Sequence, residues 1–198
     1  MSVQEHSFAN PGGAGLAALA VACFGFGAMF LGFVSHDALP ILACWLFGGF
    51  VVQIVCAVIE LKDHNPSGGN VFLFFSAFFM LVAAISCATK YGLHQAGLPF
   101  DTRIEGWGWL AGAIFLTLAT PAYLKSTKLL FIAFIFIDVA LWGIVAMDLK
   151  IGNPHIFAPI VGWILIGVGF VGAYLSGAIT TNLTLGKSVL PIPGPFIK

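Results

Sequence analysis

The sequence predicts an all-α integral membrane protein with six transmembrane helices. Apolar residues make up 60% of the chain and charged residues 8%, and the mean hydropathy is +1.03. With one exception, the eight basic and eight acidic side chains fall in short gaps between six long apolar runs. Each run has about the 20 residues that a helix needs to cross ~30 Å of hydrocarbon. The runs cover residues 12–34, 38–59, 71–89, 107–124, 129–147 and 156–181.

The runs are predicted to be helices because they are apolar on every face. Residues 72–80, with the sequence Phe-Leu-Phe-Phe-Ser-Ala-Phe-Phe-Met, are an example. Strands of a membrane barrel would be shorter and would alternate apolar with polar residues. No gap between runs exceeds about 20 residues, which leaves no room for a separate soluble domain. We therefore expect one membrane domain that spans residues 1–198.

Asparagine and proline mark the starts of three of these helices. Asn10-Pro11 precedes the first run, the loop 65–70 precedes the third, and Asn153-Pro154 precedes the sixth. Asn is favoured at a helix cap, and Pro is favoured in the first turn because its missing donor would be unpaired there anyway. The segment before the first run is polar and carries Glu5, unlike the basic start of a cleavable signal peptide. We expect the first run to remain in the mature protein.

The other elements differ in the polar residues that they carry. The second run contains Gln53 and ends near Glu60, whereas the fifth contains Asp138.

The longest loop, residues 90–106, lies between the third and fourth runs and is expected to fold over one mouth of the protein. The tail, residues 187–198, holds three prolines, so it cannot continue a helix and is predicted to be extended.

Small residues recur every four positions in the first and sixth runs. In lipid, helices associate through small faces that allow their backbones to approach closely. We therefore expect these two helices to pack inside the bundle, whereas the Phe-rich third and fifth runs must turn part of their surface to lipid or to a neighbouring subunit. The small residues are Ala14, Ala18 and Ala22 in the first run and Gly169, Ala173 and Gly177 in the sixth.

The distribution of Lys and Arg predicts the orientation in the membrane. Six spans place both termini on one side, and basic residues in short loops favour the cytoplasmic side. The prediction is a multi-pass protein of the plasma (inner) membrane with both termini in the cytoplasm. The side of the termini holds Lys62, Lys125, Lys128, Lys187 and Lys198, and the opposite side holds Lys90, Arg103 and Lys150.

Several function classes lack the residues that they need. There is no Gly-x-x-x-x-Gly-Lys-Ser/Thr loop for ATP phosphates and no Ser/His/Asp set for nucleophilic catalysis. The five His fall in loops or at helix ends, and the four Cys lie inside predicted helices, where they are typical of small buried residues. We expect no enzyme activity, no metal, no cofactor and no nucleic-acid partner.

Asp138 is the one charged residue in the middle of an apolar run. A charge at the bilayer centre costs about 2.5–3.5 kcal/mol on insertion scales, so its presence needs a reason. It either faces a polar pathway, where it could bind a proton or a substrate donor, or it is protonated or hydrogen-bonded to a polar partner on a neighbouring helix. Gln53 is explained equally well by helix packing and by a pathway. Glu60 is typical of a solvated end of a helix, and a pathway is the alternative.

Three motifs together resemble the acetate uptake transporter family, which includes bacterial succinate–acetate permeases and fungal relatives. Residues 9–16, Ala-Asn-Pro-Gly-Gly-Ala-Gly-Leu, resemble its Asn-Pro-Ala-Pro-Leu-Gly-Leu signature. Residues 48–53, Gly-Gly-Phe-Val-Val-Gln, followed by Glu60 and by Gly69-Asn70-x-Phe72, resemble a second motif. The third motif comprises Gly162-Trp163, Tyr174-Leu175, Asn182, Gly186 and Val189-Leu-Pro-Ile192.

The chain also departs from the family pattern. Gly13 and Ala14 replace Pro-Leu of the signature. The loop between Glu60 and Asn70 is about five residues longer than in the family pattern. A Thr pair expected in the first helix is replaced by apolar residues near Val21-Ala22. These departures leave open a substrate other than acetate.

The resemblance implies a homo-hexamer in the lipid bilayer, in which each protomer encloses its own narrow pore for small monocarboxylates and for succinate. It implies a hydrophobic constriction at Leu19, Met80 and Ile137, the last two placed by ungapped pairing. The residues predicted along the substrate pathway are Asn10, Pro11, Gln53, Glu60, Asn70 and Asp138.

The predicted function is transport of acetate or a similar small carboxylate, either channel-like or coupled to a proton. An ionised Asp138 would repel an anion in a narrow, low-dielectric path. Either Asp138 carries a proton during passage or the permeant is not an anion. Two alternatives therefore stay open: a channel for a small neutral solute such as urea or a short amide, and a membrane subunit that transports nothing.

Overall fold

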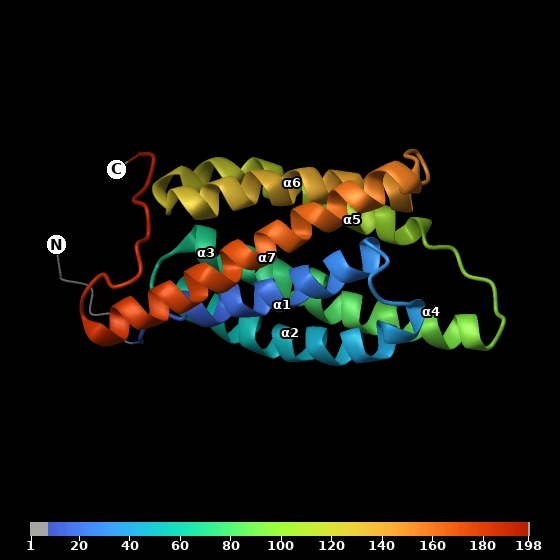
Figure 1. Cartoon of the computed structure of the whole chain (residues 1–198), viewed down its shortest axis with the longest axis horizontal. Helices are drawn as coiled ribbons and strands as arrows, with labels where there is room; N and C mark the ends of the chain where they lie inside the picture. Colours follow the sequence, from blue (N-terminus) through green and yellow to red (C-terminus); the bar gives the residue numbers. More distant parts are fainter. Residues whose placement is uncertain (1–7, 198) are drawn as a thin grey trace.

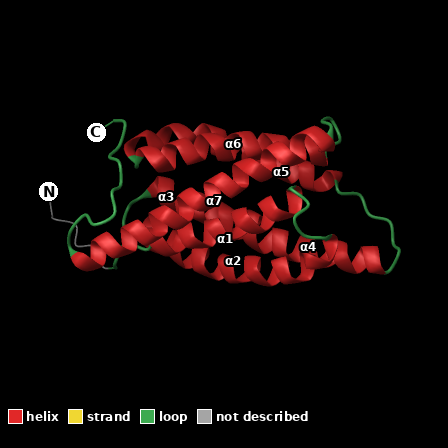
Figure 2. Ribbon diagram, viewed as in Figure 1, coloured by secondary structure: helices red, strands yellow, loops and turns green. Residues whose placement is uncertain are grey.

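Six helical spans run side by side in the computed structural model, which describes residues 8–197 (Figures 1 and 2). No strand occurs in that range. The first two spans are α1 (Gly12–Phe30) and α2 (Leu39–Lys62), the latter preceded by a short 3-10 turn, η1 (His36–Ala38). The third combines α3 (Pro66–Phe74), η2 (Phe75–Val82) and α4 (Ala83–Gln95). The others are α5 (Arg103–Ala119) with η3 (Thr120–Lys125), α6 (Lys128–Asp148) and α7 (Pro154–Leu185).

The all-α fold with six membrane-capable helices is confirmed, although several helices begin or end away from the predicted positions. The third span begins at Pro66 rather than at residue 71. The side chain of Asn65 accepts a hydrogen bond from the Gly68 amide at 3.1 Å and caps this helix, with Pro66 in its first turn. Polar residues therefore form the first turn of this span, which hydropathy alone places in the loop.

The middle of the third span is a π-helix, η2. A π-helix bonds each amide to the carbonyl five residues earlier, so a stretch of it advances the side chains by extra residues relative to an α-helix. Within this segment the Ser76 hydroxyl donates to the Phe50 carbonyl of α2 at 3.2 Å. Side chains after Phe74 therefore point in directions that a regular helix would not give.

Helices α1 and α7 cross closely in the middle of the bundle (Figure 1). A Cβ on Gly172 would lie 3.2 Å from the Leu16 carbonyl, and one on Gly27 would lie 3.1 Å from the Gly162 carbonyl. The predicted inner position of these helices is thus observed, but the small-residue face of α7 differs: Gly169 is buried, whereas Ala173 and Gly177 are exposed. Steps of four residues rotate by about 40° each on a 3.6-residue helix, so that stripe turns away from α1.

The described part of the tail, up to Ile197, has no helix or strand and lies across the end of the bundle where α1 begins (Figure 1). The Asn182 side chain donates to the Leu190 carbonyl at 2.7 Å and accepts from the amides of Val189 and Leu190. Tyr174 donates from its hydroxyl to the Pro191 carbonyl at 2.7 Å. The extended tail is thereby fastened to α7; Lys198, the end of the predicted tail, lies outside the described residues.

Candidate functional site

Three cavities lie in series along the bundle and share lining residues. The terminal vestibule, about 830 Å³, opens at the end where α1 begins. The far vestibule, about 230 Å³, lies at the opposite end, between the ends of α1, α4 and α6 and the start of α5. A constriction of about 10 Å³ separates them: it shares Leu19 and Phe75 with the terminal vestibule and Phe79 and Ile144 with the far vestibule. The cavities therefore mark one path through the protein.

Polar side chains are fixed around the mouth of the terminal vestibule. The Asn65 amide donates to one oxygen of Glu60 at 2.6 Å, and Glu60 is only 8% exposed. Asn10 accepts from the Gly12 amide at 2.8 Å, at the start of α1. Helices α1 and α3 both direct their N-terminal ends, which carry partial positive charge, toward this mouth. The vestibule thus places one buried carboxylate beside two helix ends.

Gln53 lies deeper in the same vestibule and is completely buried. Its side-chain nitrogen donates to the Gly15 carbonyl at 3.3 Å. Its oxygen has no hydrogen-bond partner among the described residues. An amide oxygen is only an acceptor, so this atom can receive the O–H of a carboxylic acid or of water that enters the vestibule.

The constriction is lined by apolar side chains from α1, η2, α6 and α7. Its volume is about the minimum that holds a single water molecule. The ring of Phe79 closes it, in edge-to-face contact with Phe75 at 5.3 Å and with Trp109 of the far vestibule at 6.0 Å between centroids. The lining residues are Leu19, Cys23, Phe75, Phe79, Ile137, Ala140, Leu141, Ile144 and Leu165.

Of the three residues expected at the constriction, Leu19 and Ile137 line it and Met80 does not. Met80 points to α2, where its sulfur lies 2.8 Å from the position that a Cβ on Gly49 would take. Phe79 occupies the place expected for Met80. Both residues lie in the π-helix η2.

Two other residues expected on the path also lie outside the cavity linings. The Asn70 side chain is exposed and donates to the Pro66 carbonyl at 2.8 Å, within the first turns of α3. The Pro11 carbonyl accepts a weak hydrogen bond from Cys56 at 3.3 Å. Asn65 lines the vestibule and caps α3, although it is not among the residues predicted along the path. Its signal was the Asn65-Pro66 pair, the same pattern as Asn10-Pro11.

Asp138 contacts the neighbouring span and lines none of the three cavities. One of its oxygens lies 2.7 Å from the Thr120 hydroxyl, and that hydroxyl also lies 3.0 Å from the Leu116 carbonyl. The single hydrogen of a Thr hydroxyl can serve only one acceptor. Both contacts are hydrogen bonds when Asp138 is protonated and donates to Thr120, which then donates to Leu116. This geometry fits a neutral carboxyl group bonded to its neighbour.

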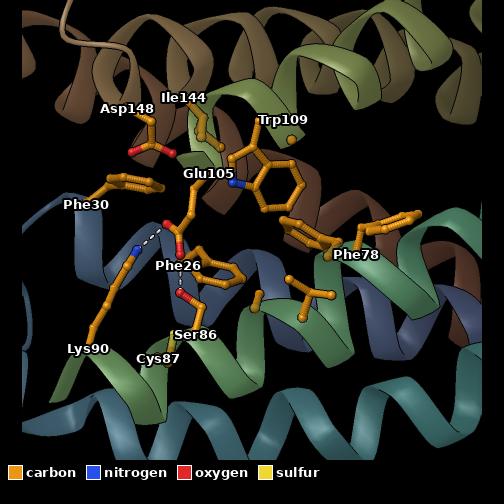
Figure 3. Close-up of a pocket in the computed structure, with 14 residues that line it drawn as sticks. Phe26, Phe30, Phe78, Ser86, Cys87, Lys90, Glu105, Trp109, Ile144 and Asp148 are labelled. Carbon is orange, nitrogen blue, oxygen red and sulfur yellow. Dashed lines mark hydrogen bonds and ion pairs between the residues drawn. The ribbon is translucent and has the colours of Figure 1, made fainter. Parts of the chain in front are cut away.

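The far vestibule contains a charged cluster (Figure 3). Glu105, in the first turn of α5, accepts hydrogen bonds from the Ser86 hydroxyl and from the Lys90 ammonium, both on α4. Asp148, at the end of α6, lines the same cavity, and Phe30 and Trp109 form aromatic walls. Glu105 and Lys90 lie at the ends of the predicted loop 90–106, and the sequence indicates no role for them, because their contact depends on the angle between α4 and α5.

A second ion pair lies outside the cavity, in the loop before α5. Arg103 donates to the two oxygens of Asp101 at distances of 2.5–3.0 Å. This side-chain hydrogen bonding holds the pKa of Asp101 below its ordinary value. Both side chains are more than half exposed, so the pair contributes little to stability.

Comparison with known proteins places this architecture among membrane transport proteins. The model of the GPR1/FUN34/yaaH family matches residues 1–193. The chain is 28% identical over 184 residues to the succinate-acetate/proton symporter SatP of Escherichia coli strain K12, a match that covers 93% of this chain and 95% of the relative. It is 26% identical over 151 residues to acetate permease A of Emericella nidulans, covering 70% of this chain and 49% of that protein.

A solved structure has the same fold. The structure of the bacterial acetate channel SatP superposes with a TM-score of 0.81 at 23% identity, and the match covers 94% of this chain and 99% of that one. The six-helix architecture is therefore shared along nearly the whole of both chains.

Proposed function

Because the chain belongs to the GPR1/FUN34/yaaH family, we propose that it moves acetate or another small monocarboxylate across a membrane, through the path inside each protomer. The observation that carries this proposal is the series of two vestibules joined by an apolar constriction, between residues of α1, η2, α6 and α7. The similarity to a bacterial succinate-acetate/proton symporter and to a fungal acetate permease supports acetate as the substrate class, with succinate beside it.

The constriction favours a neutral permeant. An ion without hydrogen-bond partners is very costly to place in an apolar surrounding, whereas a protonated carboxylic acid loses far less solvation there. We propose that the carboxylate crosses together with a proton, as the neutral acid, when Phe79 and Leu19 rotate out of its way. The aromatic contacts of Phe79 hold the closed arrangement that the structure describes.

The terminal vestibule supplies groups that suit the acid form. Gln53 offers its unpaired oxygen to the O–H of the acid, and Glu60 offers a carboxylate that can exchange a proton. Asn10 orders the backbone at the mouth through its bond to Gly12. We propose these three residues as the pathway on this side, followed by Leu19, Phe79 and Ile137 at the constriction.

We propose that the protein assembles as a homo-hexamer, as the family resemblance implies. An apolar surface groove of about 550 Å³ between α1 and α2 supports an interface there. Small residues such as Ala14 and Gly48 line it, beside the ring of Trp45, and small residues let helices approach closely in a membrane. The excess of Lys on the side of the termini supports an orientation with cytoplasmic termini in the plasma membrane.

Urea or a short amide fits this path less well than a carboxylic acid. Such solutes need several hydrogen bonds at once, and the constriction lining provides no polar side chain other than the thiol of Cys23. A subunit that transports nothing would keep the constriction closed to every solute. Both alternatives are decided by the experiment below.

The test is uptake by proteoliposomes that contain the purified protein. With an acidic outer solution, we expect uptake of labelled acetate well above that of protein-free liposomes, and no faster swelling in urea than the liposomes alone show. The variant Ile137→Trp should block uptake by filling the constriction, whereas Ile132→Trp, on the exposed face of the same helix, should not. Absence of acetate uptake at every pH would refute the proposal.

A further inference from the structure

In the charged cluster of the far vestibule, the carboxylate of Glu105 is bound in a way in which a substrate carboxylate could also be bound. Ser86 donates to one oxygen of Glu105 and Lys90 donates to the other. Ser86 and Lys90 are four residues apart, so they share one face of α4, and Glu105 reaches them from the start of α5 (Figure 3). A hydroxyl and an ammonium group are thus spaced to hold the two oxygens of one carboxylate.

We propose that Ser86 and Lys90 form a binding site for the permeant carboxylate in the far vestibule, and that Glu105 occupies this site as a built-in competitor. The inference rests on the proposed function for the identity of the ligand, a small monocarboxylate. When the Glu105 side chain turns away from Lys90, the ammonium group becomes free to bind the carboxylate that arrives.

The site is both open enough and enclosed enough for this exchange. Cavity space of about 230 Å³ adjoins the cluster, so a small carboxylate can reach Lys90 without displacement of a helix. The side chain of Lys90 is 32% exposed and that of Glu105 is 25% exposed. Partial burial strengthens hydrogen bonds between charged groups, yet both side chains remain in reach of solvent.

The charges around the cluster make Glu105 decisive for binding. Lys90 from α4 and the carboxyl groups of Glu105 from α5 and Asp148 from α6 are the charged side chains that line this vestibule in residues 8–197. The Cys87 thiol of α4 also faces it, and α1 contributes only Phe26 and Phe30. With both carboxyl groups ionised the vestibule carries one net negative charge and repels an anion. Removal of the Glu105 charge makes it neutral.

The same charges select the class of carboxylate. A monocarboxylate can place its only charge on Lys90 and its methyl group against the aromatic walls. The second carboxylate of a dicarboxylate would lie near Asp148 or Glu105. We therefore expect acetate to bind this site better than succinate at neutral pH.

Binding of carbon-13 acetate to the purified, detergent-solubilised protein tests the inference, with NMR line broadening at pH 7 as the readout. Glu105→Gln removes the competing carboxylate and should bind acetate more tightly than the wild type, by roughly tenfold, the scale of one hydrogen bond to a charged group. Lys90→Gln should weaken binding roughly tenfold or more.

Matched variants separate this role from a structural one. Asp101→Asn breaks the other ion pair at the same end of the bundle, outside the cavity, and should leave acetate binding unchanged. Glu105→Asp and Lys90→Arg keep the charges and should bind acetate about as the wild type does. If Lys90→Gln does not fold, Ser86→Ala serves in its place, with a smaller loss of affinity expected.

The inference is overturned if the wild type does not bind acetate, if Glu105→Gln binds acetate no more tightly than the wild type, or if neither Lys90→Gln nor Ser86→Ala weakens binding. Uptake assays on the same variants keep it distinct from the proposed function. If the wild type takes up acetate and the variants bind it as the wild type does, only the inference is refuted, and the proposed function stands. A wild type that binds acetate in the expected pattern but takes up none refutes transport and leaves the site in place.

Discussion

At the scale of single residues, the pair of Thr120 and Asp138 shows how this membrane helix tolerates an acid. Thr120 is buried and lies between a carbonyl of its own span and the carboxyl group of α6. A chain of hydrogen bonds through one hydroxyl fits a neutral carboxyl group better than a charged one, because the single hydroxyl hydrogen cannot serve both acceptors. The other oxygen of Asp138 is buried and has no hydrogen-bond partner among the described residues. The acid therefore joins α6 to the fourth span.

Replacement of either partner separates this role from a role in the pathway. Thr120→Val has nearly the same shape but leaves Asp138 without its partner, so we expect destabilisation of about 1–3 kcal/mol in thermal or denaturant unfolding. Asp138→Asn can donate to Thr120 and should keep both stability and the pH profile of acetate uptake. A shift of that profile in Asp138→Asn would instead place the residue on the path.

Gln53 offers a second test at this scale. Gln53 lines the terminal vestibule, and Gln53→Leu removes its side-chain oxygen, which has no partner among the described residues. The KM for acetate uptake should therefore rise roughly tenfold while the amount of folded protein stays similar. Ser76→Ala is the matched control, because Ser76 is equally buried and also bonds to a backbone carbonyl but lines none of the cavities. Equal KM values for both variants would remove Gln53 from the path.

The sequence identifies some of these residues, but it does not reveal the contacts of others. Gln53 and Glu60 are found because their motif and depth in the second run single them out, and both line the terminal vestibule. Asp138 is found as an anomaly, but the face that it occupies depends on the rotation of α6 and on Thr120, which looks unremarkable in its run. The contact of Lys90 with Glu105 joins two spans through a loop, and no local pattern reports it.

At the scale of elements, the π-helix η2 decides which side chains reach the constriction. It turns Phe75 and Phe79 to the path and leaves Met80 against Gly49 of α2. A π-helical turn in a membrane span is an irregularity that often accompanies a functional site. Here it places aromatic rings at the narrowest point.

Two neighbouring substitutions test this register. Phe79→Ala should widen the constriction, so that proteoliposomes take up butyrate as well as acetate. Met80→Ala should leave the selectivity unchanged and lower stability by about 2–5 kcal/mol, because it empties a completely buried position. The opposite pattern, with wider selectivity in Met80→Ala, would place Met80 rather than Phe79 at the constriction.

Hydropathy predicts the elements themselves well and their ends less well. All six spans appear, because apolar runs of this length have no other stable form in lipid. The third span begins earlier than its apolar run, since Asn65 and Pro66 form a polar but well-capped first turn. The π-helix has no sequence signal of its own: Phe residues occur on all sides of this span, and only contacts with the other helices select the register.

At the scale of the whole molecule, the tail closes over the mouth where the chain begins. It runs from α7 across this end of the bundle to η3, where the amides of Phe196 and Ile197 donate to the Leu124 carbonyl at 3.1 Å. Ile197 lines the terminal vestibule. The extended form was predicted from the prolines, but its position was not, because it depends on Asn182 and Tyr174 of a distant turn of α7.

Asn182 should control the release of this tail. Asn182→Ala removes three hydrogen bonds to residues 189–190, so trypsin should cleave after Lys187 roughly tenfold faster than in the wild type. Asn153→Ala, which removes a cap at the opposite end of α7, should not change that rate. Equal rates in the two variants would show that other contacts hold the tail.

The constriction of about 10 Å³ matters for the membrane voltage as well as for the permeant. A space this small holds no chain of water molecules, so protons cannot hop through it unaccompanied. A neutral acid that crosses moves no net charge, so the membrane voltage neither drives nor opposes its movement, and the final distribution follows the pH difference alone. If the permeant crosses as the neutral acid, as proposed, a membrane that carries many copies of this protein keeps its voltage while acid crosses it.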